Sequence, residues 1–314
     1  MKEPLIVLTG PTSVGKTSLS IALARQVDGE IISADSMQVY RHMDIGSAKI
    51  RPEEMDGITH YLVDVMDPLE DFNIVRFQQM AKEAMAEIRG KGRIPILVGG
   101  TGFYIQAVTR NIDFSPEDEG TRIRNDLEAM AEEKGPLYLH QMLMEVDPES
   151  AAQIHANNVK RVIRALEFYK VSGQPISQHN EEQSEKETPF NLAYFVLNAP
   201  RDLLYHRIDQ RVDQMMEAGL VDEVRALQEM GCHRGINSMQ GLGYKEILDY
   251  LEGRTDLSEA VRVLKRDTRH FAKRQLTWFR REKDVIWVNK EEFDFDDNRI
   301  LTFILEKCRE KGII

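Results

Sequence analysis

A glycine-rich phosphate-binding pattern near the start of the chain constrains the fold more than any other feature. Residues 10–17 fit G-x-x-x-x-G-K-[ST], with the apolar run LIVLTG before them and the helically spaced SLSIALARQV after them. Such a loop turns successive N–H groups toward an anion, and the start of the following helix adds partial positive charge. We therefore predict that the phosphates of a ligand such as ATP bind to Gly10, Pro11, Thr12, Ser13, Val14, Gly15, Lys16 and Thr17. Lys16 would reach the terminal phosphate, and the Thr17 hydroxyl is the expected magnesium ligand.

Strands and helices alternate through the first hundred residues. The run IVRFQQMAKEAMAEIRG places Ile74, Phe77, Ala81 and Ile88 on one helical face and ends at Gly90. Alternation of this kind predicts a parallel α/β sheet with right-handed crossovers and flanking helices. The further strands are expected at residues 30–34, 60–65, 93–100, 191–198 and 285–289.

The alternation stops near Asp113. Residues 113–190 contain 16 acidic and 8 basic residues, have helical spacing without a convincing strand, and end in the polar segment HNEEQSEKETPF. NLAYFVLN then resumes the β pattern. The sequence therefore predicts a discontinuous P-loop core, residues 1–112 with 191–314, interrupted by an all-helical domain at 113–190.

Composition excludes several classes of protein. The chain has 314 residues, of which 42% are hydrophobic and 30% charged, and its longest apolar runs fall well short of the ~18 residues of a membrane span. The opening MKEPLIVLTG leads into a strand without a signal-peptide plan, so we expect a cytoplasmic protein with no membrane partner. Cys232 and Cys308 stand apart, which excludes a disulfide framework or a zinc site. Nothing implies a protein partner, and a monomer is expected.

Charge is distributed unevenly. The formal net charge of −11 argues against nucleic-acid binding by the protein as a whole. However, the stretch VRVLKRDTRHFAKRQLTWFRREK near the C-terminus is strongly basic. The position of charge is thus more informative than its total.

The phosphate loop identifies phosphates but not the reaction. Nucleotide-hydrolysing relatives usually place an aspartate at the end of a buried strand, whereas IPILV ends in Gly99-Gly100-Thr101. Asp64 is either a substitute metal ligand or a surface residue at a strand end. Asp35 follows EIISA at the edge where parallel sheets bind ligands, although a turn cap would have the same position. With Thr101 in the same layer, a phosphate loop, a carboxylate and a hydroxyl are expected to share one cleft.

Further segments carry a resemblance to the bacterial tRNA dimethylallyltransferases. In chain order they are ISADSMQVYRHMDIGSAK, HYLVDVMDP, RIPILVGGTGFY, NNVKRVIRALE, RVDQM, GLVDEV, GLGYKEI and RHFAKRQLTWFR, and they run along nearly the whole chain. The most specific are DS-x-Q-x-Y with DIG-x-AK after it, and KRQ-x-TWFR. The resemblance implies transfer of a dimethylallyl group from dimethylallyl diphosphate to the exocyclic N6 amine of adenine at tRNA position 37, with release of diphosphate and use of Mg²⁺.

The resemblance also implies a role for each candidate residue. Asp35 would be the base that takes the proton of the amine, and Thr101 would orient it. Arg211 in RVDQM would stabilise charge on the leaving diphosphate, with Arg207 as the alternative one helical turn earlier. The adenine must leave its stack to be reached. Its implied contacts are Asp35, Ser36, Met37, Gln38 and Thr101.

Two groups of basic residues are expected to hold the anticodon arm of the tRNA by its phosphates. One shares a helical face within the insertion, and the other lies in the basic C-terminal stretch; either is otherwise an ordinary solvated helix face. Trp278 and Phe279 are interleaved with the second group, and we expect them to pack in the core rather than to stack on bases. The two groups are Lys160, Arg161 and Arg164, and Lys273, Arg274 and Arg280.

Other activities would also explain the phosphate loop at residues 10–17 and, in part, Asp35. Adenylate isopentenyltransferases share the P-loop and the aspartate but act on free nucleotides. A small-molecule P-loop kinase, or a non-catalytic RNA-binding switch, would also use residues 10–17. The KRVIRALE helix and the basic C-terminal stretch favour tRNA over a free nucleotide, and a kinase would leave the basic stretch without a role. A non-catalytic switch would not explain Asp35 beside Thr101. Unlike eukaryotic relatives, the chain has no C-terminal Cys/His zinc finger, since its tail holds Cys308 alone.

Overall fold

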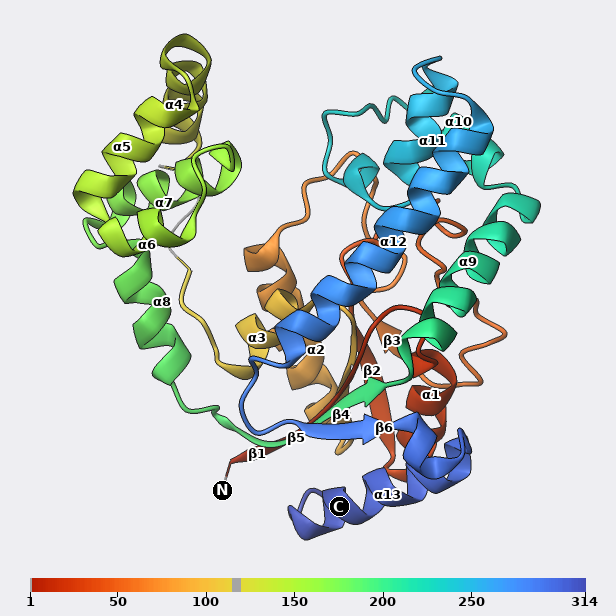
Figure 1. Cartoon of the computed structure of the whole chain (residues 1–314). Coiled ribbons are helices and arrows are strands. Elements are labelled where there is room, and N and C mark those ends of the chain that lie inside the picture. The colour runs from red at the N-terminus through yellow and green to blue at the C-terminus, as the bar shows by residue number, and fades with distance from the viewer. Residues whose placement is uncertain (1, 115–119) are drawn as a thin grey trace. The chain divides into compact units, whose positions relative to one another are not determined.

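The computed structural model describes residues 2–114 and 120–314 and divides into two compact units (Figure 1). The core unit consists of Met1–Thr109 and Pro189–Ile314, and the inserted unit is Arg110–Thr188. These boundaries differ from the predicted ones by three residues at one end of the insertion and two at the other. Among the residues that the structure describes, no helix is long and apolar enough to cross a membrane.

The core is built on a parallel sheet of six strands in the order β3-β2-β4-β1-β5-β6. The predicted fold class, a P-loop-type parallel sheet with flanking helices and a helical insertion, is confirmed. All strands point the same way, so the loops that follow β1, β2 and β4 meet at one edge. The strands are β1 (Glu3–Thr9), β2 (Gly29–Ala34), β3 (His60–Tyr61), β4 (Ile94–Gly99), β5 (Phe190–Asn198) and β6 (Ile286–Asn289).

Side-chain alternation along the strands divides the core into two apolar layers. Leu5 and Val7 of β1 join the cluster on one face of the sheet, whereas Ile6 and Leu8 join the cluster on the other. All four are fully buried. A parallel sheet covered on both faces requires strands that are apolar throughout, and LIVL meets this requirement.

One strand is shorter than predicted. The expected strand at 60–65 contains only His60 and Tyr61, because Leu62 and Asp64 have φ angles of 60° and 59°. These left-handed conformations are incompatible with an extended strand. The chain therefore leaves the sheet after Tyr61.

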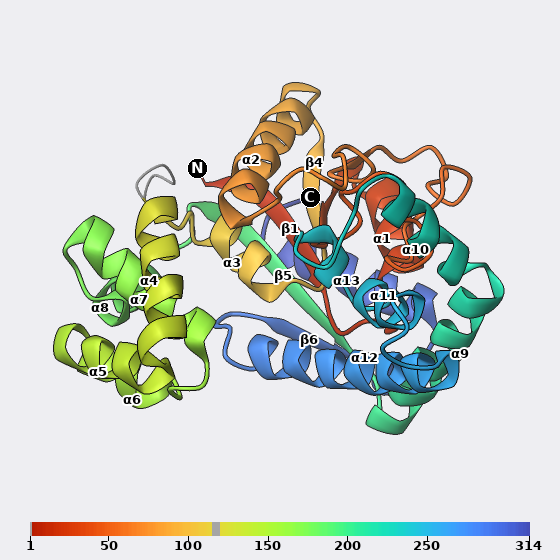
Figure 2. The same cartoon turned by 90° about the horizontal axis from the view of Figure 1, so that it is seen from above.

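Helices cover both faces of the sheet. The long helix α12 contacts α11 near one end and α3 near the other, and it passes over the edge where the strands end (Figures 1 and 2). The Asp256 side chain caps α12 by accepting from the N–H of Glu259, and Asn73 caps α2 in the same way. The core helices are α1 (Lys16–Gln26), α2 (Ile74–Gly90), α3 (Gly102–Thr109), α9 (Arg201–Glu217), α10 (Leu220–Glu229), α11 (Tyr244–Leu251), α12 (Leu257–Phe279) and α13 (Asp297–Glu310), with short 3₁₀ helices at Ser238–Gln240 and Lys290–Phe293.

The inserted unit has a small apolar core of its own. Leu127, Leu139, Leu143, Val162 and Leu166 pack together in it. Because Val162 and Leu166 are one turn apart, they fix which face of their helix is buried. The helices are α4 (Gly120–Lys134), α5 (Pro136–Val146), α6 (Pro148–Gln153), α7 (Val159–Ser172) and α8 (Ile176–Glu185).

Candidate active site

The phosphate loop follows β1 and depends on its two glycines. Gly10 has a φ of 147° and Gly15 a φ of 92°, conformations that side chains disfavour. A Cβ on Gly10 would also lie 2.5 Å from the carbonyl oxygen of Leu197. The ammonium of Lys16 donates to the carbonyl oxygens of Gly10 (3.0 Å) and Pro11 (2.9 Å), which folds the side chain back over the loop.

Asp35 lies directly after β2, and one of its carboxylate oxygens caps the turn that follows. Its Oδ1 accepts from the N–H of Met37 (2.8 Å) and of Gln38 (3.3 Å), as a turn cap does. Its other oxygen, Oδ2, accepts no hydrogen bond from the described residues. The Gln38 side chain is itself held, since its amide donates to the carbonyl of Ala48 (3.3 Å).

Three charged side chains of the core, those of Lys16, Arg211 and Asp35, interact electrostatically. Burial and, to a smaller extent, the nearby Arg211 together lower the pKa of Lys16 to about 8, although Asp35 opposes the shift. Burial also lowers the pKa of Arg211, again opposed by Asp35. Arg211 donates to the Thr12 hydroxyl (3.2 Å), while Arg207 makes no such bond among the described residues. The structure thus brings Arg211 to the phosphate loop.

Thr101 begins the turn after β4, beside Asp35. Its N–H donates to the carbonyl of Ala34 (3.2 Å), the residue that precedes Asp35. The two strand ends approach so closely that a Cβ on Gly99 would lie 2.2 Å from the Ala34 carbonyl oxygen. The phosphate loop, the carboxylate and the hydroxyl therefore end at one edge of the sheet, as their positions in the sequence suggested.

Gln275 of α12 is a member of this site that the sequence interpretation missed. Its Oε1 accepts from the Thr12 N–H, and its Nε2 donates to the Gly100 carbonyl, both at 2.9 Å. Gln275 belongs to the motif KRQ-x-TWFR, in which only the cations and the aromatic residues were considered as functional. The available signal was helical spacing: Ala272, Gln275 and Phe279 share a buried face, where an uncharged polar side chain needs partners.

Three of the characteristic motifs form one hydrogen-bond network. The Glu223 carboxylate accepts from the consecutive N–H groups of Asp44 (2.9 Å), Ile45 (2.7 Å) and Gly46 (3.0 Å), and from the Tyr244 hydroxyl (2.8 Å). Burial and the adjacent Glu223 raise the pKa of Tyr244 well above its usual value. DIGSAK, GLVDEV and GLGYKEI are thus joined, and they fix the segment that follows Gln38.

The carboxylate of Asp64 is already engaged. Lys49 donates to it at 2.7 Å, and also to Asp44 (2.5 Å) and to the carbonyl of Tyr40 (2.6 Å). Over residues 2–114 and 120–314, no three His, Cys, Asp or Glu side chains gather in a way that would hold a metal ion. The exposed Thr17 hydroxyl fits Mg²⁺, an ion that takes few protein ligands and completes its shell with phosphate oxygens and water.

The three cations predicted on α7 are not equivalent. Lys160 and Arg161 are exposed and form no ion pair in the described part of the chain. Arg164 instead pairs with the buried Glu167 (3.2 Å), which also binds Arg124 (2.8 Å). Part of the charge of Arg164 is therefore compensated within the insertion.

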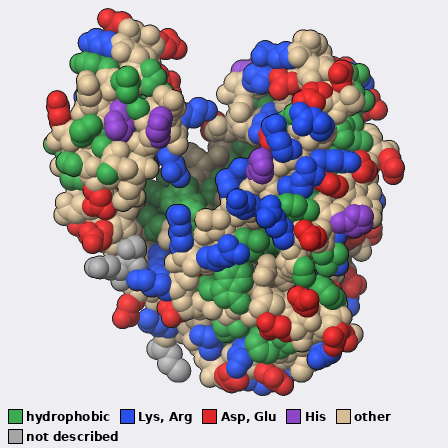
Figure 3. Space-filling model, viewed as in Figure 1, with side chains coloured by type: hydrophobic (Ala, Val, Ile, Leu, Met, Phe, Trp, Pro, Cys, Tyr) green, Lys and Arg blue, Asp and Glu red, His purple; other side chains and the backbone are tan. Residues whose placement is uncertain are grey.

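The cations of α12 and those just after it differ in how they are paired. Every lysine and arginine of α12 up to Arg269 has an acidic partner, whereas the predicted cations near its C-terminal end and just after it have none among the described residues. Basic side chains gather over this helix in Figure 3. The paired residues are Arg262 with Glu259, Lys265 with Asp213, Arg266 with Asp267 and Arg269 with Asp209; the unpaired ones are Lys273, Arg274, Arg280 and the adjacent Arg281.

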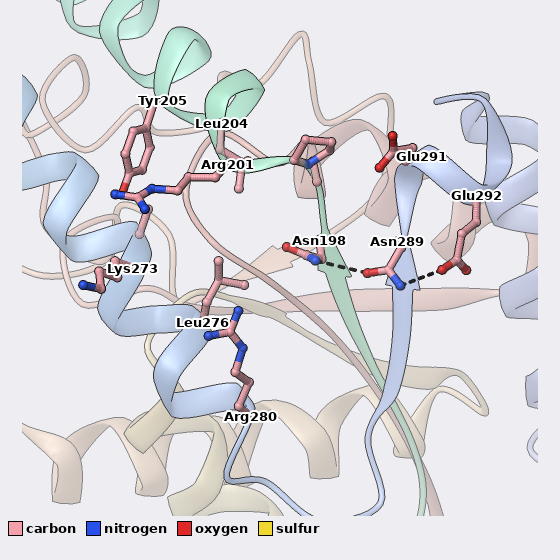
Figure 4. A pocket seen from close by; sticks show the side chains of 13 residues that line it. Asn198, Arg201, Leu204, Tyr205, Lys273, Leu276, Arg280, Asn289, Glu291 and Glu292 are labelled. Atoms are coloured by element: carbon pink, nitrogen blue, oxygen red, sulfur yellow. Dashed lines mark hydrogen bonds between the residues drawn. The ribbon is translucent and has the colours of Figure 1, made fainter.

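Two of the unpaired cations border a pocket of about 480 Å³ on the core (Figure 4). Lys273 and Arg280 lie on its α12 side, Arg201 lies opposite at the start of α9, and the ends of β5 and β6 complete it. The aromatic residues between these cations face inward: Phe279 is fully buried, and Trp278 packs edge to face against Phe103. Phe279 is thus a core residue, and Trp278 is partly buried against the same apolar cluster.

Known proteins are similar to this chain in sequence and in structure. A family model described as IPP transferase matches residues 38–282, most of the chain. The chain belongs to this family. The predicted family and the predicted enzyme class, a prenyl transferase, are confirmed.

Individual relatives match most or all of this chain. A protein of Lachnoclostridium phytofermentans named tRNA dimethylallyltransferase is 60% identical over 312 residues, 99% of either chain. The crystal structure of a Bacillus halodurans tRNA isopentenylpyrophosphate transferase is similar with a TM-score of 0.74 and 46% identity, covering 99% of this chain and 98% of that one. A eukaryotic dimethylallyltransferase described as acting on tRNA matches with a TM-score of 0.78 and 31% identity over 91% of this chain and 74% of its own.

Proposed function

We propose that this chain transfers the dimethylallyl group of dimethylallyl diphosphate to the N6 amine of adenine 37 in tRNA and releases diphosphate. One observation carries the proposal: Asp35, with one oxygen open, lies close enough to Lys16 of the phosphate loop and to Arg211 of α9 to affect the pKa of both. A base and a site for an anionic leaving group are thus adjacent. The names of the full-length relatives support the same reaction.

The donor diphosphate would bind on residues 10–17. Backbone N–H groups of the loop and the start of α1 attract the anion. Lys16, which now donates to two loop carbonyls, would exchange them for phosphate oxygens, and Arg211 would add a second cation. Both charges act where negative charge grows as the carbon–oxygen bond breaks. Mg²⁺ held by Thr17 would neutralise further charge on the diphosphate.

The acceptor side would be formed by Asp35 and Thr101. The amine nitrogen attacks the first allylic carbon, the bond from that carbon to the diphosphate oxygen breaks, and the amine proton passes to the Asp35 carboxylate. Thr101 would orient the base by a hydrogen bond. The adenine must be flipped out of the anticodon loop, and Ser36, Met37 and Gln38 would contact it together with these two residues.

The tRNA itself would be held by exposed cations. Two sets of cations are suited to phosphate contacts, because no acidic side chain among the described residues neutralises them. They are the unpaired cations at the C-terminal end of α12, with those just after it, and Lys160 with Arg161 on α7. Arg164 contributes less, since it already neutralises Glu167. A free nucleotide, as in the adenylate alternative, would leave most of these cations without a partner.

A direct assay separates the candidate functions. Purified protein is incubated with labelled dimethylallyl diphosphate and one of three acceptors: an anticodon stem-loop with adenine at position 37, the same RNA with guanine there, or AMP. We expect label only in the adenine RNA. Label in AMP would favour the adenylate isopentenyltransferase, and phosphate transfer from labelled ATP to a small molecule would favour a kinase.

We further propose a cytoplasmic enzyme that acts as a monomer. The Asp35 site draws all of its residues from a single chain, so the proposed chemistry needs no second copy. Sedimentation equilibrium at micromolar concentration is expected to give the mass of one chain, 36.1 kDa. A stable dimer would contradict this part of the proposal.

A further inference from the structure

The side chain of Gln275 joins two loops that are far apart in the sequence. It extends from α12, is only 6% exposed, and uses both ends of its amide on the backbone of other segments. Its partners, Thr12 and Gly100, lie in the loops after β1 and β4. Since a buried amide with both polar groups satisfied has few alternative arrangements, it fixes the spacing of these loops.

Each partner belongs to one side of the proposed reaction. Thr12 is part of the phosphate loop and accepts a hydrogen bond from Arg211 through its hydroxyl. Gly100 precedes Thr101, whose N–H binds the carbonyl of Ala34 next to Asp35. One end of the amide therefore holds the donor side, and the other holds the acceptor side.

We propose that Gln275 is a positioning residue that sets the distance between the leaving diphosphate and the base. This inference rests on the proposed transfer reaction. A displacement reaction requires its nucleophile and its electrophilic carbon within about 3–3.5 Å and in line, so a small change in loop spacing costs rate. Gln275 contacts neither substrate in this scheme and acts only through the two loops.

The chemistry of the site requires an amide of this length. The Thr12 N–H needs an acceptor and the Gly100 carbonyl needs a donor, and among side chains of this length and shape only glutamine offers both. Glutamate would put a second acceptor against the Gly100 carbonyl, and asparagine is one methylene too short to span the gap. A Cβ on Gly100 would lie 2.2 Å from the Gln275 amide nitrogen, so a side chain at position 100 would displace this amide.

The test compares Gln275→Met, Gln275→Asn and Gln275→Glu with wild type in single-turnover transfer at saturating donor and stem-loop RNA. We expect the rate of the transfer step to fall by about 10- to 100-fold. The KM for dimethylallyl diphosphate and the Kd for RNA should stay within threefold. Gln78→Met is the matched control, since Gln78 is also a buried glutamine bound to backbone, the carbonyl of Ala107. It should lower the melting temperature while leaving the rate per folded molecule unchanged.

The outcomes are distinguishable. Transfer rates within twofold of wild type in folded Gln275→Asn and Gln275→Glu would overturn the inference, as would a loss that only tracks the unfolded fraction. Loss of donor affinity at an unchanged rate would make Gln275 a donor-binding residue and would also overturn it. Gln275→Glu, of the same size as glutamine, keeps the test valid if Gln275→Met does not fold. If wild type itself fails to modify RNA, the proposed function is wrong instead.

Discussion

Lys16 and Arg211 on one side and Lys273 and Arg274 on the other are all assigned to phosphate groups, yet their surroundings are opposite. The first two are largely withdrawn from water, and burial lowers the pKa of each. The second two are exposed on α12. Charges act strongly in a desolvated site, whereas salt and water screen exposed charges. We therefore expect the buried group to control the chemical step and the exposed group to control RNA affinity.

The same contrast occurs within α12. Every cation of α12 up to Arg269 has an acidic partner, whereas Lys273 and Arg274 near its C-terminal end, and Arg280 and Arg281 just after it, have none among the described residues. A net charge of −11 on the whole chain repels RNA in general. Unpaired cations must then be concentrated locally if RNA is to bind, and pairing is a better indicator of an RNA surface than the number of basic residues.

The largest effect is expected at the carboxylate of Asp35. Asp35→Asn keeps the turn cap but cannot take the proton, so kcat should fall by about 10² to 10⁴. RNA affinity should change little, because the exposed cations are untouched. Near-normal turnover of Asp35→Asn or Asp35→Ala at saturating substrates would refute the assignment of Asp35 as base.

Removal of phosphate contacts in the loop is expected to come next. Lys16→Ala should lower kcat/KM for the donor by about 10² to 10³, comparable to the loss of one group that stabilises developing charge. Thr17→Ala should shift the magnesium requirement to higher concentration. Equal donor binding and turnover in wild type and Lys16→Ala would show that the diphosphate binds elsewhere.

The pH dependence of donor binding separates buried from exposed charge. Lys16 has a pKa of about 8 in the free protein, and the protonated form attracts the anion. The Kd for inorganic diphosphate, divided by that of Lys16→Met at each pH so that the titration of the ligand cancels, should thus be flat well below pH 8 and rise by up to about tenfold per pH unit above it. Calorimetry from pH 6.5 to 9.5 measures this change. A ratio that does not vary with pH would exclude Lys16 as the source of the dependence.

A moderate effect is expected from the unpaired cations at the C-terminal end of α12. Lys273→Gln with Arg274→Gln should weaken stem-loop binding and reduce the slope of log K against log salt by about 0.7 to 0.9 per lost phosphate contact. Arg262→Gln with Arg266→Gln removes the same charge from the paired part of the same helix and is the matched control. Equal losses in both double variants, measured across a salt series, would mean that pairing does not identify the RNA surface.

The smallest effect is expected on α7. Arg164→Gln should weaken RNA binding less than Lys160→Gln, because its charge is already partly used by Glu167. The free energy of unfolding of Arg164→Gln should fall by less than about 1 kcal/mol, since Arg164 is half exposed and Arg124 still binds the buried Glu167. Filter binding and urea denaturation of the two variants check both statements. A larger RNA defect in Arg164→Gln would reverse the predicted order.

Local patterns in the sequence were enough to predict much of this protein. The loop at 10–17, the apolar strands and the helical spacing of the insertion depend on neighbouring residues, so they are readable from the chain itself. The strand at 60–65 was predicted too long because its residues are apolar, while the left-handed turns at Leu62 and Asp64 end it. Apolar character does not report the backbone conformation that interrupts a strand.

The sequence by itself determined the fold class, the phosphate loop and the family, because each rests on contiguous residues or on motifs in order. Only the tertiary structure decided which residues meet at the loop. Arg211 reaches Thr12 across 199 positions of the chain and Gln275 reaches it across 263, and no local spacing encodes such contacts. The same holds for the cations, since the partner that neutralises Lys265 or Arg269 comes from another helix. Long-range packing thus determines which partners these side chains contact.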